Sequence, residues 1–115
     1  VDTSRIYLTG FSMGGIGTLD FAIRYPHRFA ALIPIAFRIE DGWDLCVIKD
    51  IPLWGFHGQH DPIIPLYKAQ SVITTLINCG GSPLFTIYSD LFHDAWTRTY
   101  NNPDIYNWLL SKRIQ

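Results

Sequence analysis

Apolar residues along this chain fall into two kinds of segment, short continuous runs and longer stretches with helical spacing. The short runs are rich in β-branched and aromatic residues, which predicts strands over residues 5–10, 29–37, 51–58 and 84–89. In the other segments apolar positions recur at helical intervals, which predicts helices over residues 14–25, 66–78 and 104–113. Pro26 and the pair Gly80-Gly81 mark the ends of the first two helices.

Strand and helix segments alternate along the whole chain. This order is typical of an α/β fold with a mostly parallel sheet, here of about four strands, and helices on its faces. Residues 1–115 contain no linker or repeat, and we expect a single domain. Pro34 predicts an irregularity within its strand, and residues 38–50 predict a loop with a short helical turn. Ligands of such sheets bind at the carboxyl ends of the strands, so the loops that leave the strands are the place to look for reactive side chains.

The composition excludes several classes of function. Nine basic and ten acidic residues give a net charge of −1 without any basic run, which excludes a surface for nucleic acid or an anionic membrane. No apolar run reaches the length of a transmembrane helix, so we expect a soluble segment without a membrane span. Cys46 and Cys79 lack metal-site spacing; we expect both to be buried as small apolar residues, and they indicate no redox compartment.

The first strand-to-helix corner, Gly10-Phe11-Ser12-Met13-Gly14, places a serine between two glycines. A sharp turn of this type exposes the serine hydroxyl as a nucleophile, and its backbone angles and close strand–helix packing require glycine. The amide of Met13, at the start of the following helix, is then placed to bind an oxyanion. The alternatives are an ordinary turn with an N-capping serine, or a phosphate-binding loop, although the latter lacks its usual lysine and glycine spacing.

A serine nucleophile on such a corner requires an acid and then a histidine, each after a later strand. Asp61 follows the strand over residues 51–58, and His93 follows the strand over residues 84–89. We expect His93 to take the Ser12 proton and Asp61 to orient the imidazole. Asp41 and Asp44, after the preceding strand, are the second choice for the acid.

The remaining histidines have other expected roles. His57 lies within a strand and is expected to be a packed residue that supports the acid loop, whereas His27 and His60 are expected near a helix end and on the loop. A metal site made of His57, His60 and Asp61 is an alternative, but their spacing separates the two rings and no fourth ligand lies nearby. We therefore predict no metal and no cofactor.

Aromatic residues lie close to these three positions. Trp54 is expected to pack in the core. Phe11, Phe92 and Trp96 are predicted to contact substrate, as a wall beside the acyl chain or the leaving group.

Three segments together resemble the carboxyl-terminal half of an α/β-hydrolase: the Ser12 corner with its additional Gly15, the run His57-Gly58-x-x-Asp61, and the run His93-Asp94-Ala95-Trp96. They are similar to dienelactone hydrolases, phospholipases/carboxylesterases and prolyl-oligopeptidase-like serine hydrolases. The resemblance implies a partial α/β-hydrolase fold, with Ser12 as nucleophile, Asp61 as acid, His93 as base and Met13 as one oxyanion donor. It implies a small-molecule carboxylic ester as substrate; the alternatives are a serine peptidase and a non-catalytic module that binds a ligand or partner.

Two features depart from the family pattern. Phe92 stands where the family usually has glycine, and a bulky residue there is expected to alter the loop or to crowd the pocket. The resemblance also implies earlier strands, including the loop that supplies the second oxyanion amide. We therefore expect these 115 residues to be a fragment that is weakly active or inactive alone and that self-associates through the exposed edge of strand 5–10.

Overall fold

The computed structural model describes residues 1–114 and contains one parallel sheet. Its strands are β1 (Tyr7–Phe11), β2 (Ala31–Ile35), β3 (Trp54–Gly58) and β4 (Leu84–Tyr88), in the spatial order β1-β2-β3-β4. Neighbouring strands are also consecutive in the sequence, and every pair is parallel. The expected α/β architecture with a four-stranded parallel sheet is therefore confirmed.

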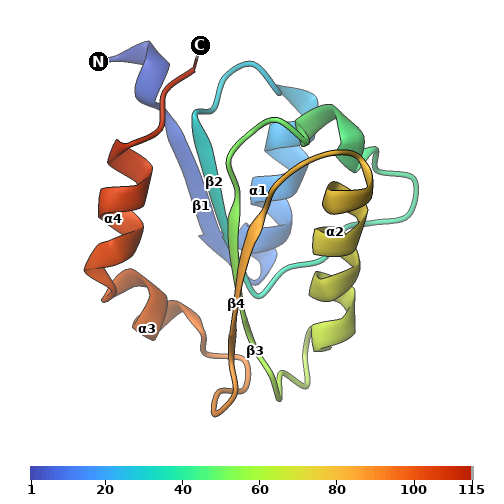
Figure 1. Ribbon diagram of the computed structural model, residues 1–115. Coiled ribbons are helices and arrows are strands. Elements are labelled where there is room, and N and C mark those ends of the chain that lie inside the picture. The colour runs from blue at the N-terminus through green and yellow to red at the C-terminus, as the bar shows by residue number, and fades with distance from the viewer. Residues whose placement is uncertain (115) are drawn as a thin grey trace.

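Helices cover both faces of this sheet (Figure 1). Helices α1 (Met13–Arg24) and α2 (Leu66–Asn78) lie on one face, and α3 (Trp96–Tyr100) and α4 (Pro103–Leu110) lie on the other. Successive residues of β2 point to opposite faces, so Leu32 packs in the cluster beneath α1 and α2 whereas Ile33 packs against Ala95 and Ile105. This two-sided burial explains why the second predicted strand is a continuous apolar run.

The helices differ from expectation at the carboxyl end of the chain. The five-residue α3 was not predicted, because so short a segment shows no helical periodicity. Helix α4 begins where the Asn102 side chain accepts a hydrogen bond from the Asp104 amide, and it ends at Leu110. Lys112 thus lies beyond the helix, with its ammonium 5.5 Å from the centre of the Trp108 ring.

Pro34 does interrupt the sheet. Strand β2 pairs with β1 at five positions, but among residues 1–114 its pairing with β3 is limited to the pair Ile35↔Phe56 and an isolated bridge between Leu32 and Leu53. Proline has no amide hydrogen, so it cannot donate a hydrogen bond to the sheet. The loop that follows contains the expected short helical turn, η2 (Leu45–Ile48), and another such turn, η1 (Thr3–Arg5), precedes β1.

The expectation for the two cysteines is wrong. Cys46 in η2 and Cys79 at the end of α2 form a disulfide, and Cys46 is exposed rather than buried. The prediction failed because the packing of η2 against α2 brings together two residues that are 33 positions apart. The disulfide ties η2 to the carboxyl end of α2.

Strands β1, β3 and β4 end at the same edge of the sheet, so the loops that carry Ser12, Asp61 and His93 leave from one edge. Within residues 1–114 no helix is long and apolar enough to cross a membrane.

Candidate active site

Ser12 occupies a strained turn between β1 and α1. Its backbone has φ 59° and ψ −113°, a conformation that residues other than glycine rarely adopt. The Ser12 amide donates to the carbonyl of Ile35, which ties the turn to the end of β2. The hydroxyl makes no helix-capping hydrogen bond, so this is not an ordinary N-capping serine.

Two glycines allow this turn to form, but only one of them is the residue expected. A side chain on Gly10 would overlap the backbone of Gly14, which confirms the requirement at that position. A side chain on Gly14 itself would meet nothing within 4 Å. The second requirement lies at Gly15, where a Cβ would stand 2.6 Å from the carbonyl oxygen of Ile35.

The three side chains predicted for the site form one hydrogen-bonded series. His93 Nε2 lies 2.9 Å from Ser12 Oγ, and His93 Nδ1 lies 2.7 Å from Asp61 Oδ2. A carboxylate oxygen only accepts, so Nδ1 carries the proton when the ring is neutral, and Nε2 is free to accept from the serine hydroxyl. The Asp61 side chain is fully buried, whereas that of His93 is 26% exposed. This arrangement can withdraw a proton from the serine.

The carboxylate of Asp61 is oriented by backbone groups. Asp61 Oδ1 accepts hydrogen bonds of 2.8 and 2.9 Å from the amides of Ile63 and Ile64, which leaves Oδ2 directed at His93. The second-choice acids are not at this site. Asp44 instead accepts a hydrogen bond from the Cys46 amide at the start of η2, and Asp41 is exposed. Of the three candidate carboxylates, Asp61 is the one hydrogen-bonded to His93.

His57 is buried beside this acid, as expected for a residue that supports the loop. Its Nε2 lies 2.7 Å from the carbonyl oxygen of Ile64 and 3.5 Å from Asp61 Oδ2. Burial lowers the pKa of His57 below its ordinary value. His60, in contrast, is exposed. Within residues 1–114 no three histidine, cysteine, aspartate or glutamate side chains are arranged to hold a metal ion.

The loop that carries His93 is closed by an ion pair that the sequence did not suggest. Arg98 donates hydrogen bonds of 2.8 and 2.9 Å to the two carboxylate oxygens of Asp90, and its guanidinium lies 5.2 Å from the centre of the Tyr88 ring. Hydrogen bonds from Arg98 lower the pKa of Asp90 to about 2. No local pattern reveals such a pair, because its partners lie on opposite sides of the loop.

The three predicted substrate contacts occupy different positions around the site. The Phe11 ring lies beside His93: its centre is 4.9 Å from that of the His93 ring and 6.1 Å from that of the Trp96 ring. Trp96 is 44% exposed. Phe92 is 62% exposed and its ring centre lies 5.4 Å from that of His60, while His93 stays within hydrogen-bond distance of Ser12 Oγ, so Phe92 does not displace the His93 ring.

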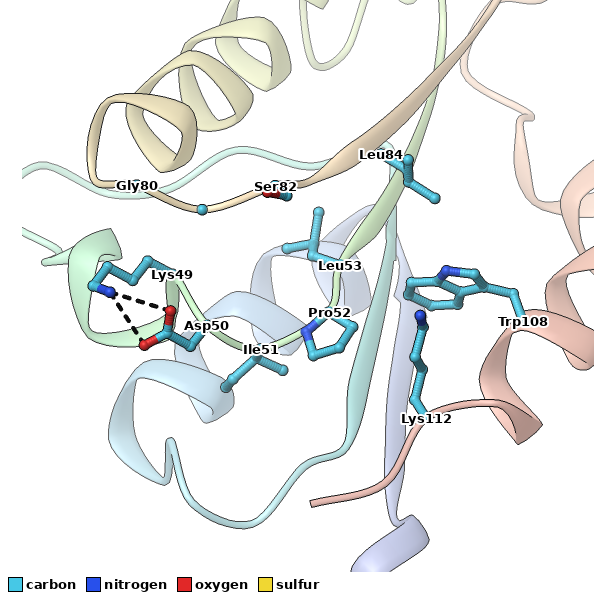
Figure 2. Close-up of a pocket in the computed structure, with 11 residues that line it drawn as sticks. Lys49, Asp50, Ile51, Pro52, Leu53, Gly80, Ser82, Leu84, Trp108 and Lys112 are labelled. Carbon is cyan, nitrogen blue, oxygen red and sulfur yellow. Dashed lines mark hydrogen bonds and ion pairs between the residues drawn. The ribbon is translucent and has the colours of Figure 1, made fainter. Parts of the chain in front are cut away.

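A separate hollow of about 390 Å³ lies at the opposite end of the sheet (Figure 2). It is lined by residues that precede β3 and β4 and by Trp108 and Lys112, and the lysine beside it, Lys49, pairs with Asp50. None of Ser12, Asp61 and His93 lines it. It is distinct from the candidate active site.

Comparisons with known proteins find a hydrolase family and esterases among the relatives of this chain. A family model described as Phospholipase/Carboxylesterase matches residues 1–107. A bifunctional acetylxylan esterase/xylanase from Neocallimastix patriciarum is 26% identical over an alignment 117 positions long, which covers 94% of this chain and 16% of that protein. The crystal structure of a thermostable esterase superposes with a TM-score of 0.91 at 36% identity, over 98% of this chain and 32% of that one.

More distant structures share the fold alone. An acylaminoacyl peptidase has a TM-score of 0.78 at 18% identity, over 99% of this chain and 24% of that one. The chain thus spans about a third or less of the length of each of these three relatives.

Proposed function

The chain belongs to the phospholipase/carboxylesterase family of hydrolases, and from this premise we propose that it carries the reacting residues of a serine esterase. In this proposal Ser12 is the nucleophile, His93 the general base and Asp61 the acid that orients it. The observation that supports it most directly is the unbroken series of hydrogen bonds from Ser12 Oγ through His93 to Asp61 Oδ2. The strained conformation of Ser12 supports it further, because such strain clusters at active sites.

The first half-reaction forms an acyl-enzyme. His93 Nε2 takes the hydroxyl proton as Ser12 Oγ attacks the ester carbonyl, and the resulting imidazolium is stabilised by Asp61. Met13 is the first residue of α1, so its amide has no acceptor within the helix and is available to the developing oxyanion. The C–O bond then breaks, and the alcohol leaves with the proton held on His93 Nε2.

The second half-reaction releases the acid. His93 takes a proton from a water molecule that attacks the acyl carbon, and the same Met13 amide binds the second oxyanion. When the intermediate collapses, the bond from the acyl carbon to Ser12 Oγ breaks and His93 returns the proton to the serine. No metal or organic cofactor takes part in these steps.

The substrate in this proposal is a carboxylic ester with an apolar group next to the carbonyl. Phe11 and Trp96 form an aromatic surface beside His93, and Met13 is 83% exposed at the start of α1. The similarity to an acetylxylan esterase favours a short acyl group, which these residues could contact.

A fluorophosphonate probe tests the proposal because it reacts with activated serines. We expect modification of Ser12 in the complete gene product, abolished by Ser12→Ala and strongly slowed by His93→Ala. Parallel assays with p-nitrophenyl acetate and an amino-acid p-nitroanilide distinguish an esterase from a peptidase. A folded protein that neither reacts with the probe nor hydrolyses either substrate would instead be a non-catalytic binding module.

A further inference from the structure

His57 is a buried titratable side chain that the proposed reaction does not use. It lies in β3, four residues before Asp61, and is fully buried. We propose that its imidazole is a positioning residue, which holds the acid loop in place through a single fixed tautomer. The inference rests on the proposed function, since it assigns a role in orienting the acid of that reaction.

The two hydrogen bonds of the ring determine the tautomer. The Phe37 amide donates to His57 Nδ1 at 3.3 Å, so Nδ1 carries a lone pair. Nε2 lies 2.7 Å from the Ile64 carbonyl oxygen, which can only accept, so Nε2 carries the hydrogen. Protonation of Nδ1 would direct a hydrogen at the Phe37 amide and break that bond. The buried ring is therefore held neutral.

The bond to Ile64 connects His57 to the acid. Both backbone polar groups of Ile64 are hydrogen-bonded: its carbonyl accepts from His57, and its amide donates to Asp61 Oδ1. A shift of this carbonyl would move the amide as well, and with it the carboxylate. Because the other oxygen, Oδ2, lies 2.7 Å from His93 Nδ1, the position of the loop sets the geometry of that hydrogen bond.

The opposite side of His57 is hydrogen-bonded to the segment that follows β2, the strand whose end also binds the Ser12 amide. The carbonyl of Ile35 accepts from the Ser12 amide, and two residues later the Phe37 amide donates to His57. Between them Ala36 has φ 52°, a left-handed conformation that turns the chain at the end of β2. The segment from Ile35 to Phe37 therefore binds the Ser12 turn directly and the Asp61 loop through His57.

A neutral ring at this position also preserves the charge balance of the site. The groups that face it are Asp61, at 3.5 Å, and beyond it His93. A cationic His57 would compete with the His93 imidazolium for the one carboxylate. Burial is the main cause of the lowered pKa of His57, and it favours the neutral ring beside Asp61.

A matched pair of substitutions in the complete gene product tests the role. The amide nitrogen of His57→Gln reaches the position of Nε2 and can donate to Ile64, whereas His57→Asn can accept from Phe37 but is too short to reach Ile64. Fluorophosphonate labelling then gives a maximal rate and a half-saturating probe concentration for each variant. Val72→Ala, on the buried face of α2, is a control for loss of stability alone.

We expect His57→Asn to lower the maximal labelling rate about 10- to 100-fold while the half-saturating concentration changes little. His57→Gln should label at close to the wild-type rate, and Val72→Ala should label normally at temperatures well below its melting temperature. Normal labelling of folded His57→Asn would overturn the inference and leave the proposed function intact. A wild-type protein that does not label at all would overturn both.

A measurement on the wild-type protein decides the matter if His57→Asn does not fold. The ¹⁵N shifts of the imidazole rings should identify His57 as the neutral Nε2–H tautomer from about pH 5 to 8, the range in which ordinary histidines titrate. A titrating His57, or one protonated at Nδ1, would contradict the inference.

Discussion

The backbone carbonyl of Phe92 occupies the space that a side chain on Gly58 would require. Gly58 ends β3 and begins the acid loop, and Phe92 immediately precedes His93. At this point the two loops therefore approach each other through backbone atoms, with no room for a side chain between them. This contact sets the distance between the loop that carries Asp61 and the loop that carries His93.

Gly58→Ala should push these loops apart. The added methyl group cannot be accommodated without moving backbone, so we expect about 1–3 kcal/mol lower free energy of unfolding. The displaced His93 should lower the rate of fluorophosphonate labelling about 10- to 100-fold. Stability is measured by urea unfolding and labelling is measured under fully folded conditions.

Gly17→Ala is the matched control. Gly17 lies within α1, and a methyl group there meets nothing within 4 Å. Alanine favours a helix over glycine, so stability should rise by about 0.5–1 kcal/mol with labelling unchanged. Equal losses in the two variants would show that the Gly58 contact does not set the site geometry.

Replacement of Ser12 should separate backbone strain from chemistry. Ser12→Ala and Ser12→Gly both remove the hydroxyl and should both abolish labelling. Only glycine relieves the positive φ of 59°, so Ser12→Gly should be more stable than Ser12→Ala by about 1 kcal/mol. Thermal unfolding of the two variants makes the comparison, and equal melting temperatures would argue against strain at this turn.

The lowered pKa of His57 should make stability depend on pH. The unfolded chain binds a proton at this residue near its ordinary value of 6.5, whereas the folded chain binds it only at lower pH. The free energy of unfolding should therefore fall as the pH drops below about 6.5, by up to about 1.4 kcal/mol per pH unit, and this group should have no effect well above that value.

His57→Gln isolates this contribution, because it removes the titrating group and keeps the donor. Urea unfolding between about pH 5 and 8 should give a steeper acid slope for the wild type than for the variant. Parallel curves would indicate that His57 binds protons equally in the folded and unfolded chains.

The disulfide should contribute substantially to stability. It joins residues 33 positions apart. Closing a loop of that length lowers the entropy of the unfolded chain and stabilises the folded state by about 3–4 kcal/mol. Reduction, or replacement of Cys46 and Cys79 by serine, should lower the free energy of unfolding by that amount without changing labelling of the folded protein. Identical urea curves with and without reductant would contradict the prediction.

We also propose that the free edge of β1 promotes self-association of the 115-residue chain. Among residues 1–114, β1 pairs only with β2. The Ile6 carbonyl and the Ser12 amide point towards β2, so by the alternation of a strand the Thr9 amide points outwards. Sedimentation velocity over a range of concentrations should detect oligomers.

Thr9→Pro should weaken these oligomers, because it removes an outward amide without removing a hydrogen bond to β2. Thr9→Val is its control, since both substitutions lose the side-chain bonds to Ile33 and Tyr100 but valine keeps the amide. A chain that remains monomeric at every concentration would disprove the proposal.

The positions of Ser12, Asp61 and His93 could be predicted from the sequence, because each is a polar residue that comes after an apolar strand segment. Ser12, Asp61 and His93 each lie in the turn or loop that follows a strand, and in a parallel sheet the carboxyl ends of neighbouring strands lie at the same end of the sheet. The helix over residues 66–78 was predicted to the residue, because its apolar spacing is regular and Gly80, with φ 98°, closes it.

Other features had no signature in the sequence. The amides of Ile63, Ile64 and Phe37 orient the acid and His57, but any residue other than proline supplies an amide. The disulfide and the pair Asp90–Arg98 depend on how distant or looped segments pack. The requirement for Gly15 rather than Gly14 arises from the close approach of α1 to the end of β2, a tertiary contact between separate elements.

The separation of Ser12 and His93 by 81 residues has a consequence for how the chain folds. A contact this distant in sequence forms only after the entropic cost of closing the intervening chain has been overcome. Helices α1 and α2 can therefore form well before Ser12 meets His93. A refolding chain should regain circular dichroism first and reactivity towards the probe last. Reactivity towards the probe therefore reports that the strands have paired in their final register.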